Sequence, residues 1–337
     1  MNSLERVIAA VHFQPTDRVP VMPQVFGHAA VLAGVRLGAY LRDGALLARC
    51  QLHALAYYAY DAVFALMDVN VETEALGSTL TYHPDQYPSV RSYRLAGAAK
   101  LDTLAVPDPQ RAGRMPEVLK AARILRQTVG RDVPVVGCVM GPMTLATQLL
   151  GIEAALYLAI DHPEQFADLL DFTAEVGMRF GLAQMEAGAH LPIVFDPSAS
   201  PEVIPPAFYR ELVLPRLTRV FTAFKQAGAP INWLHTAGMT TPILSFYPNA
   251  GVELANLDFC VDPQQAMQVL PQTCLDGNLK PLLFVEGTPA EVAAESLRLL
   301  HLFAHRGGFI LSSGCEIPPE SQPENIAALV HATRQPR

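Results

Sequence analysis

The stretch GFILSSGCEIPPESQPENI, residues 308–326, shows the pattern that decides the fold. The apolar run GFILSS (308–313) is followed by a turn that holds a cysteine, an acid and two prolines, and a helix starts after it. A run that is apolar on both faces is typical of a buried strand in a parallel sheet. We therefore predict a strand–turn–helix unit, with the thiol of Cys315 placed where the strand ends.

Similar units recur along nearly the whole chain. The strand candidates are VPVMPQV (19–25), AVFALM (62–67), VPVVGCV (133–139), LPIVF (191–195), INWLH (231–235), VELANL (252–257), TCLDG (273–277) and GFILSS (308–313). Longer helical patterns lie between them, at 163–188, 206–227 and 289–305 among others. Because strands that alternate with helices form a parallel sheet, about eight such units predict a (β/α)8 TIM barrel of the α/β class.

The connection after the second strand is unusually long. Residues 72–130 exceed what one crossover needs, so we predict an insertion there, with a hairpin around 78–93. We find no repeat, low-complexity tract or linker in the sequence. Residues 1–337 are therefore predicted to form one barrel domain.

Composition narrows the function classes. The chain has 337 residues, of which 50% are hydrophobic and 17% charged, which favours a folded core over disorder. A net charge of -8 argues against binding a phosphate backbone. No apolar stretch approaches the roughly 18 residues that span a bilayer, and the start lacks a secretion-signal pattern. The 5 cysteines are scattered and without CxxC pairs, so we expect no disulfide framework and a cytoplasmic location.

Polar residues stand where nearly every predicted strand ends. They are Asp68, the GPMT turn (141–144), Asp196, His235, Asp258, Asn278 and Cys315. Each alone has an ordinary explanation as a helix cap, a structural hydrogen-bonding group or a small buried thiol. In a barrel, however, these positions meet at one mouth, where the chemistry of such folds is found. Gln24 and His28, after the first strand, are further candidates for contact with a substrate.

Taken in order, seven motifs resemble the uroporphyrinogen decarboxylase superfamily. They are DRVPVMP, DAVFALMDVNVETEALGSTL, GPMTLATQLLG, DPSASPEVIPPAFY, WLHTAG, GNLKP and SGCEIPPESQPENI, and they span essentially the whole chain. The resemblance implies a barrel with a deep mouth. It also implies one of two activities, since the superfamily divides into decarboxylases and corrinoid-dependent methyltransferases.

The decarboxylase branch fits poorly. Its arginine motif, which holds the carboxylates of the tetrapyrrole, corresponds here to PQVFGHAAVLAG (23–34), which contains no arginine. The branch's aspartate matches Asp68, but its tyrosine falls at Gln148, its serine near Pro197 and its histidine at Cys315. We therefore expect no decarboxylation of uroporphyrinogen.

The methyltransferase branch has a cysteine where this chain has Cys315. The resemblance implies a zinc ion held by a His-x-Cys pair and this distant cysteine, and here His235 and Cys315 match while Ala237 replaces the middle cysteine. Cys260 or Glu316 could supply the third ligand, and Asp196 or Asp258 are further possibilities. The alternative is a site without metal, in which His235 and Asp68 position or protonate a substrate.

We therefore expect a methyltransferase that moves a methyl group between a corrinoid protein and a small-molecule donor or acceptor. The corrinoid would come from the partner, because the chain has no recognisable cobalamin-binding segment. The expected catalytic residues are His235, Cys315 and Asp68, and the expected substrate-binding residues are Gln24, His28, Gln148, Asp196 and Asn278. The alternatives are a decarboxylase-like enzyme acting on a porphyrin or related acid, and a binding protein without catalysis.

Overall fold

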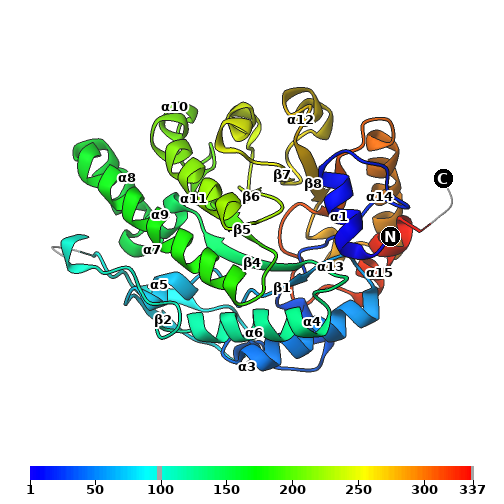
Figure 1. The fold of residues 1–337 in the computed structure, drawn as a ribbon, viewed down its shortest axis with the longest axis horizontal. Helices are drawn as coiled ribbons and strands as arrows, with labels where there is room; N and C mark the ends of the chain where they lie inside the picture. The colour runs from blue at the N-terminus through cyan, green and yellow to red at the C-terminus, as the bar shows by residue number, and fades with distance from the viewer. Residues whose placement is uncertain (97–100, 335–337) are drawn as a thin grey trace.

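The computed structural model describes residues 1–96 and 101–334 and contains a curled parallel sheet of seven strands (Figure 1). The strands, in their order across the sheet, are β1 (Val63–Phe64), β4 (Val135–Met140), β5 (Leu191–Phe195), β6 (Trp233–His235), β7 (Leu254–Leu257), β8 (Cys274–Leu279) and β9 (Phe309–Ser313). Seven of the eight predicted strands are thus present, with ends that differ by a few residues.

The first predicted strand, residues 19–25, is different. Only Val21 pairs with the sheet, through a parallel bridge to Leu311. Proline has no N–H for a ladder, so Pro20 and Pro23 limit this segment to a short contact. It still joins the two edges of the sheet. The Met22 N–H donates to the Leu311 carbonyl (2.9 Å), and the Asp61 N–H, just before β1, donates to the Val21 carbonyl (2.8 Å). These bonds give the sheet a barrel-like form.

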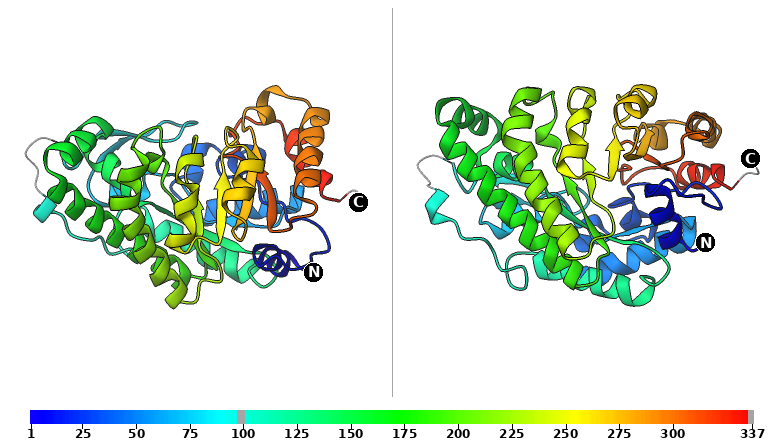
Figure 2. Two further views of the ribbon diagram at one scale, coloured as in Figure 1. Left: turned by 90° about the horizontal axis from the view of Figure 1, so that it is seen from above. Right: turned by 45° about the horizontal axis from the view of Figure 1, so that its top comes forward.

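Helices surround the strands (Figure 1). They are α1 (Ser3–Val11), α2 (His28–Leu32), α3 (Leu37–Tyr40), α4 (Gly44–Tyr58), α5 (Val71–Ala75), α6 (Met115–Thr128), α7 (Pro142–Leu150), α8 (Ile152–Asp161), α9 (Pro163–Glu186), α10 (Pro206–Phe208), α11 (Leu214–Gln226), α12 (Pro263–Val269), α13 (Leu283–Glu286), α14 (Pro289–Phe303) and α15 (Pro323–Ala332). The 3-10 helices are η1 (Leu101–Thr103), η2 (Pro197–Ala199) and η4 (Thr241–Ala250), and η3 (Tyr209–Val213) is a π-helix. Figure 2 shows α1 on the same side of the molecule as the C-terminal helices α14 and α15.

The long predicted helices are confirmed, with one change. The pattern at 163–188 forms α9, and the pattern at 289–305 forms α14, which begins with a capping box between Thr288 and Glu291. The pattern at 206–227 is instead divided into α10, the π-helical turn η3 and α11. Within the described ranges no single helix is long and apolar enough to cross a membrane, and the one pair that passes together, α7 with α8, bends by 107°.

A hairpin lies where the sequence predicted one. Strands β2 (Thr79–Thr81) and β3 (Ser89–Ser92) pair antiparallel between β1 and β4. That this hairpin belongs to an insertion into the barrel stays a prediction. Part of the predicted insertion, residues 97–100, lies outside the described residues.

Aromatic side chains fill the interior of the curled sheet. The ring of Phe64 on β1 lies 6.2 Å from that of Trp233 on β6, and Phe26 lies 5.1 Å from Phe64 and 6.0 Å from Phe195. Strands on opposite sides are therefore in contact through their rings. This packing supports the residues at the carboxyl ends of the strands from the interior of the sheet.

A buried carboxylate ties the N-terminal segment to the sheet. Asp61 is fully buried and accepts hydrogen bonds from Arg6 Nη1 (2.8 Å), Arg18 Nη1 (2.6 Å) and the Val21 N–H (2.8 Å). It therefore joins α1 to the segment that closes the sheet.

We expect Asp61→Ala to lower the free energy of unfolding by about 3 kcal/mol. Removing one partner of a buried ion pair costs about 3–5 kcal/mol. The low end applies because Arg6 keeps Asp17 as a partner and the Arg18 side chain is 19% exposed. Urea unfolding measures the change. The control is Asp171→Ala. The Asp171 carboxylate is half-exposed and pairs with Arg216 and Arg219, so its loss should lower the free energy of unfolding by no more than about 1 kcal/mol. Equal losses in both variants would contradict the special role of Asp61.

Candidate active site

Three predicted residues from distant parts of the chain meet at the carboxyl end of the sheet. His235 ends β6, and its Nε2 atom lies 3.7 Å from Sγ of Cys315, in the turn after β9. On the other side of the ring, the side-chain amide of Gln24 donates from Nε2 to Nδ1 of His235 (3.2 Å). The Gln24 N–H in turn donates to Ser313 Oγ at the end of β9 (3.2 Å). The predicted proximity of His235 and Cys315 is confirmed.

This arrangement determines where the imidazole carries its proton. His235 is 1% exposed, and burial lowers its pKa to about 3, with a smaller opposing effect of Asn256. The ring is therefore neutral at physiological pH. In the amide orientation in which Gln24 donates to Nδ1, the single ring proton lies on Nε2 and is directed toward the Cys315 sulfur.

The Cys315 thiol is held in its protonated form. Burial raises its pKa to about 11, a backbone N–H at Glu316 acts in the opposite direction, and the nearby charges of Asp258 and Glu316 raise it further. The side chain is nevertheless half-buried, not sealed. At neutral pH this is a thiol–imidazole pair without net charge.

We expect the His235 ring to stay neutral from about pH 8 to about pH 5, whereas an ordinary histidine titrates near 6.5. The reason is that its lowered pKa of about 3 lies below this range. Nitrogen-15 NMR of the ring, assigned by comparison with a His235→Gln sample, measures this. A titration midpoint above about pH 5 would contradict the burial that the structure shows.

A second set of contacts surrounds Glu316, next to Cys315. The Tyr87 hydroxyl, from the hairpin loop, donates to its Oε1 atom, and the Gly27 N–H reaches both Tyr87 Oη (2.8 Å) and Glu316 Oε1 (3.4 Å). Burial raises the pKa of Glu316 to about 7, and the hydrogen bond from Tyr87 opposes the rise. The hairpin is therefore fastened to the cysteine turn.

Asp68 does not present a free carboxylate. Arg114, which precedes α6, donates to both of its oxygens, and the Asn70 N–H also donates to Oδ1 (2.8 Å). Arg114 Nε further binds Glu74 Oε2 (2.6 Å). With an exposed fraction of 4%, Asp68 is the centre of a buried ion pair. A direct catalytic role for Asp68 stays a prediction that these contacts do not favour.

The remaining predicted substrate-binding residues already have protein partners. His28 donates from Nδ1 to the Pro319 carbonyl (3.0 Å) and accepts from the Tyr58 hydroxyl (2.8 Å). Gln148 accepts from Thr73 Oγ1 and donates to the Val69 carbonyl.

Two more of them support helix and strand ends. Asp196 accepts from the Thr144 N–H (2.7 Å) at the start of α7, and burial raises its pKa to about 6. Asn278 donates to the carbonyls of Asp258 (3.1 Å) and Val261 (2.9 Å), beyond β7. These contacts indicate that Asp196 and Asn278 shape the mouth.

The residues present do not form a complete zinc site. A catalytic zinc needs about three protein ligands, and within residues 1–96 and 101–334 no three His, Cys, Asp or Glu side chains converge in the manner of a metal site. His235 and Cys315 supply two donors, and the Nε2 atom carries a proton. Glu316 is engaged by Tyr87, and the absence of a converging metal-binding group within the described residues applies to Cys260 as well. Ala237 offers no donor.

Sequence reasoning missed several residues of the site. Arg114 and Tyr87 lie in segments without a strand or helix pattern that would have marked them. Asn256 on β7 and Asp276 on β8 are fully buried; Asn256 pairs in register with His235, and Asp276 pairs with Asn256 one strand further across the sheet. A signal did exist for Asp276, because it is an acid inside an otherwise apolar strand. Burial raises its pKa to about 7, opposed by Asn256 and Trp233.

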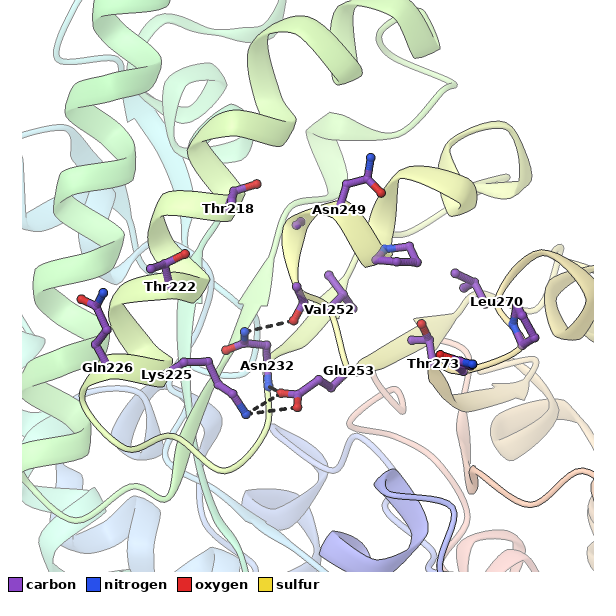
Figure 3. Close-up of a pocket in the computed structure, with 15 residues that line it drawn as sticks. Thr218, Thr222, Lys225, Gln226, Asn232, Asn249, Val252, Glu253, Leu270 and Thr273 are labelled. Atoms are coloured by element: carbon purple, nitrogen blue, oxygen red, sulfur yellow. Dashed lines mark hydrogen bonds and ion pairs between the residues drawn. The ribbon is translucent and has the colours of Figure 1, made fainter.

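A groove of about 740 Å³ lies elsewhere, between α11 and the segments before β7 and β8 (Figure 3). Its lining includes Asn232, Glu253 and Thr273, which precede β6, β7 and β8. Lys225 and Glu253 form an ion pair across it (2.8 Å). Residues before parallel strands lie at the opposite end of the sheet from His235 and Cys315, so this groove is separate from the candidate site.

Comparisons with known proteins agree with the predicted superfamily fold and with its methyltransferase branch. The family model for uroporphyrinogen decarboxylase (URO-D) matches residues 2–336. The methylcobamide:CoM methyltransferase MtaA of Methanosarcina barkeri is 30% identical, over 97% of this chain and 96% of its own. A uroporphyrinogen decarboxylase of Syntrophotalea carbinolica is 29% identical, over 96% and 95%. The solved structure of a methyltransferase from Methanosarcina mazei is 27% identical and superposes with a TM-score of 0.90, covering 99% of this chain and 98% of that one.

Proposed function

Because the chain belongs to the uroporphyrinogen decarboxylase family, we propose that it is a corrinoid-dependent methyltransferase. It moves a methyl group between a corrinoid protein and a small-molecule donor or acceptor, and the site is the His235–Cys315 pair at the barrel mouth. The corrinoid is carried by the partner protein. The coarse activity has support from the methyltransferases that match over nearly the whole chain.

The observation that carries the proposal is the contact of 3.7 Å between Cys315 Sγ and His235 Nε2. The resemblance places a histidine of the decarboxylases at the position of Cys315, and the methyltransferases place a cysteine there. The arginine motif that a tetrapyrrole with many carboxylates needs is also missing from residues 23–34. Both differences favour methyl transfer.

The proposed reaction is a methyl transfer from the donor to the acceptor. The acceptor contributes the electron pair of the new bond to carbon, and the donor keeps the pair of the bond that breaks. The Nε2–H of His235 can stabilise negative charge that develops on an atom beside it, or return a proton to it. Gln24 holds the ring in the tautomer that makes this possible. Cys315, half-buried at the mouth, contacts the same proton.

The proposal does not depend on a bound zinc ion. The family's ligand set is incomplete here because Ala237 replaces a cysteine, so we route no step through a metal. Asp68 is proposed to act through Arg114 on the shape of the mouth. His28, Gln148, Asp196 and Asn278 are proposed to position the segments that border the substrate.

Two other functions are less favoured. The fold and the presence of Asp68 support a decarboxylase-like enzyme, but the Asp68 carboxylate is held in an ion pair with Arg114. A binding protein without catalysis is suggested by Ala237 alone, and the retained histidine–thiol contact argues against it.

A methyl-transfer assay tests the proposal. Purified protein is mixed with methylcobalamin and a panel of thiol or amine acceptors, and separately with reduced cobalamin and methyl donors, while the cobalamin spectrum is followed. We expect at least one combination to be accelerated. No acceleration with any of them, together with turnover of uroporphyrinogen to coproporphyrinogen, would replace our proposal by the decarboxylase alternative.

A further inference from the structure

The groove at the opposite end of the sheet contains a buried acceptor without a partner. Asn232, directly before β6, is 4% exposed and belongs to the lining of this groove (Figure 3). Its Nδ2 atom donates to the Gly251 carbonyl (3.0 Å), whereas Oδ1 has no partner within the described residues. A turned-over amide would place its oxygen against the Gly251 carbonyl oxygen, so this orientation is fixed. Since buried acceptors in proteins are almost always paired, Oδ1 indicates a donor that the chain itself does not supply.

The charges in the groove cancel each other. Lys225 donates from Nζ to both carboxylate oxygens of Glu253 (2.8 and 3.1 Å) and to the Pro230 carbonyl (2.9 Å). Glu253 Oε2 also accepts from the Asn232 N–H (2.9 Å). Among the described residues that line the groove, no other is charged. A charged ligand would therefore find no unpaired counter-charge, and a neutral one is favoured.

The rim of the groove offers donors and acceptors together. Its exposed polar side chains can each act in both ways, and they are Thr222, Gln226, Asn249 and Gln272. Thr222 and Gln226 are four residues apart on α11, so they lie on one face of that helix. The apolar side chains of Val252 and Leu270 lie between the polar groups, and the described lining contains no aromatic ring on which a flat ligand could stack. This lining suits a molecule with several hydroxyl groups and C–H surface between them.

We propose that the groove is a second binding site, separate from the His235–Cys315 pair, and that its ligand is a neutral sugar or a sugar-like polyol. One hydroxyl of the ligand donates to Asn232 Oδ1, and the others exchange hydrogen bonds with the side chains of the rim. The volume of about 740 Å³ lies within the range of small-molecule sites and is enough for a disaccharide. The inference does not depend on methyl transfer.

A set of sugars that differ in charge tests the ligand class. Maltose, trehalose and sucrose are neutral, maltobionate is maltose with one end oxidised to a carboxylate, and the disaccharide of glucosamine is a cation at mildly acidic pH. NMR titration of the sugar signals measures affinity, and the side-chain amide signals of Asn232 report where the sugar binds. We expect at least one neutral sugar to bind about threefold or more tightly than both charged ones and to shift the Asn232 signals. No saturable binding of any neutral sugar, or tighter binding of a charged one, would overturn the inference.

Two variants locate the contact. Asn232→Leu removes the buried acceptor at similar volume and should weaken binding of the neutral sugar at least about tenfold. Because this variant also loses the bond to the Gly251 carbonyl, Thr222→Val provides a second test. It removes an exposed hydroxyl of the rim at nearly constant shape and should weaken binding about threefold. The control Thr128→Val, at an exposed position of α6, should change nothing. Unchanged binding in both groove variants, with thermal melting like the parent, would refute the assignment.

The result can be separated from that of the methyl-transfer assay. The groove and the His235–Cys315 pair lie at opposite ends of the sheet, so Asn232→Leu should lose sugar binding and keep the methyl-transfer rate of the parent. A parallel loss of both in a folded variant would show that the two sites are not separate and would contradict the proposal.

Discussion

Replacing Cys315 by serine is expected to slow methyl transfer at least about 100-fold, and His235→Gln should have a similar effect. Serine keeps the size of the side chain but lacks the sulfur that lies 3.7 Å from Nε2 of His235. Glutamine keeps a polar group but cannot carry a proton between a ring nitrogen and a reacting atom. Because the two residues act on one contact, the double variant should be little slower than either single variant.

The matched control is Cys260→Ser, which changes another half-buried cysteine, in the turn after β7. It should keep nearly full activity. Rates are measured in the methyl-transfer assay, with thermal melting to show that each variant is folded. A Cys260→Ser loss as large as that of Cys315→Ser would place Cys260 in the reacting group. Full activity in Cys315→Ser would remove the thiol from the mechanism.

The strands were predictable because burial on both faces leaves a simple mark. LPIVF forms β5 at the residues expected, and GFILSS forms β9 with a difference of one residue. The segment 19–25 shows the limit of this signal. Its apolar residues are buried, but two prolines prevent a regular ladder, so hydrophobicity alone predicted a strand where the chain makes a single bridge.

The site was predictable in part, for a related reason. The end of a strand is fixed by the strand, so His235 and Cys315 were expected at one mouth and are found in contact. Side-chain partners are not fixed in this way. Nothing near Asp68 in the sequence indicates that Arg114, 46 residues further on, takes up its carboxylate. Gln24 likewise was expected to meet a substrate and instead binds the imidazole.

Ala237→Cys is expected to raise zinc affinity by orders of magnitude. The substitution adds a third soft donor to His235 and Cys315, which completes the usual set of three protein ligands. One sulfur is a small addition at a half-buried position, and the turn is held by the bond from the Gly238 N–H to Asp258 (2.7 Å), so the fold should tolerate it. β6 ends at His235, and residue 237 lies in this turn.

The ring of His235 must also change for zinc to bind. Its Nε2 atom carries the proton while the Gln24 amide donates to Nδ1. If that amide turns over, its Oε1 atom, which has no partner in the present orientation, accepts a hydrogen bond from an Nδ1–H group, and Nε2 is then free to bind the metal. We therefore expect Gln24→Leu to weaken zinc binding in the Ala237→Cys background, because nothing would then fix the required tautomer.

Zinc retained after dialysis measures the prediction in the parent protein, Ala237→Cys, Ala237→Ser and Ala237→Cys/Cys315→Ser. Only Ala237→Cys should approach one zinc per chain, since serine is a harder and weaker ligand and the double variant again has two donors. Equal retention near one zinc in parent and Ala237→Cys would show that another residue, such as Cys260 or Glu316, already completes the site. No zinc in any of the four would show that residue 237 does not face His235 and Cys315, and would leave the thiol–imidazole pair as a site that never required a metal.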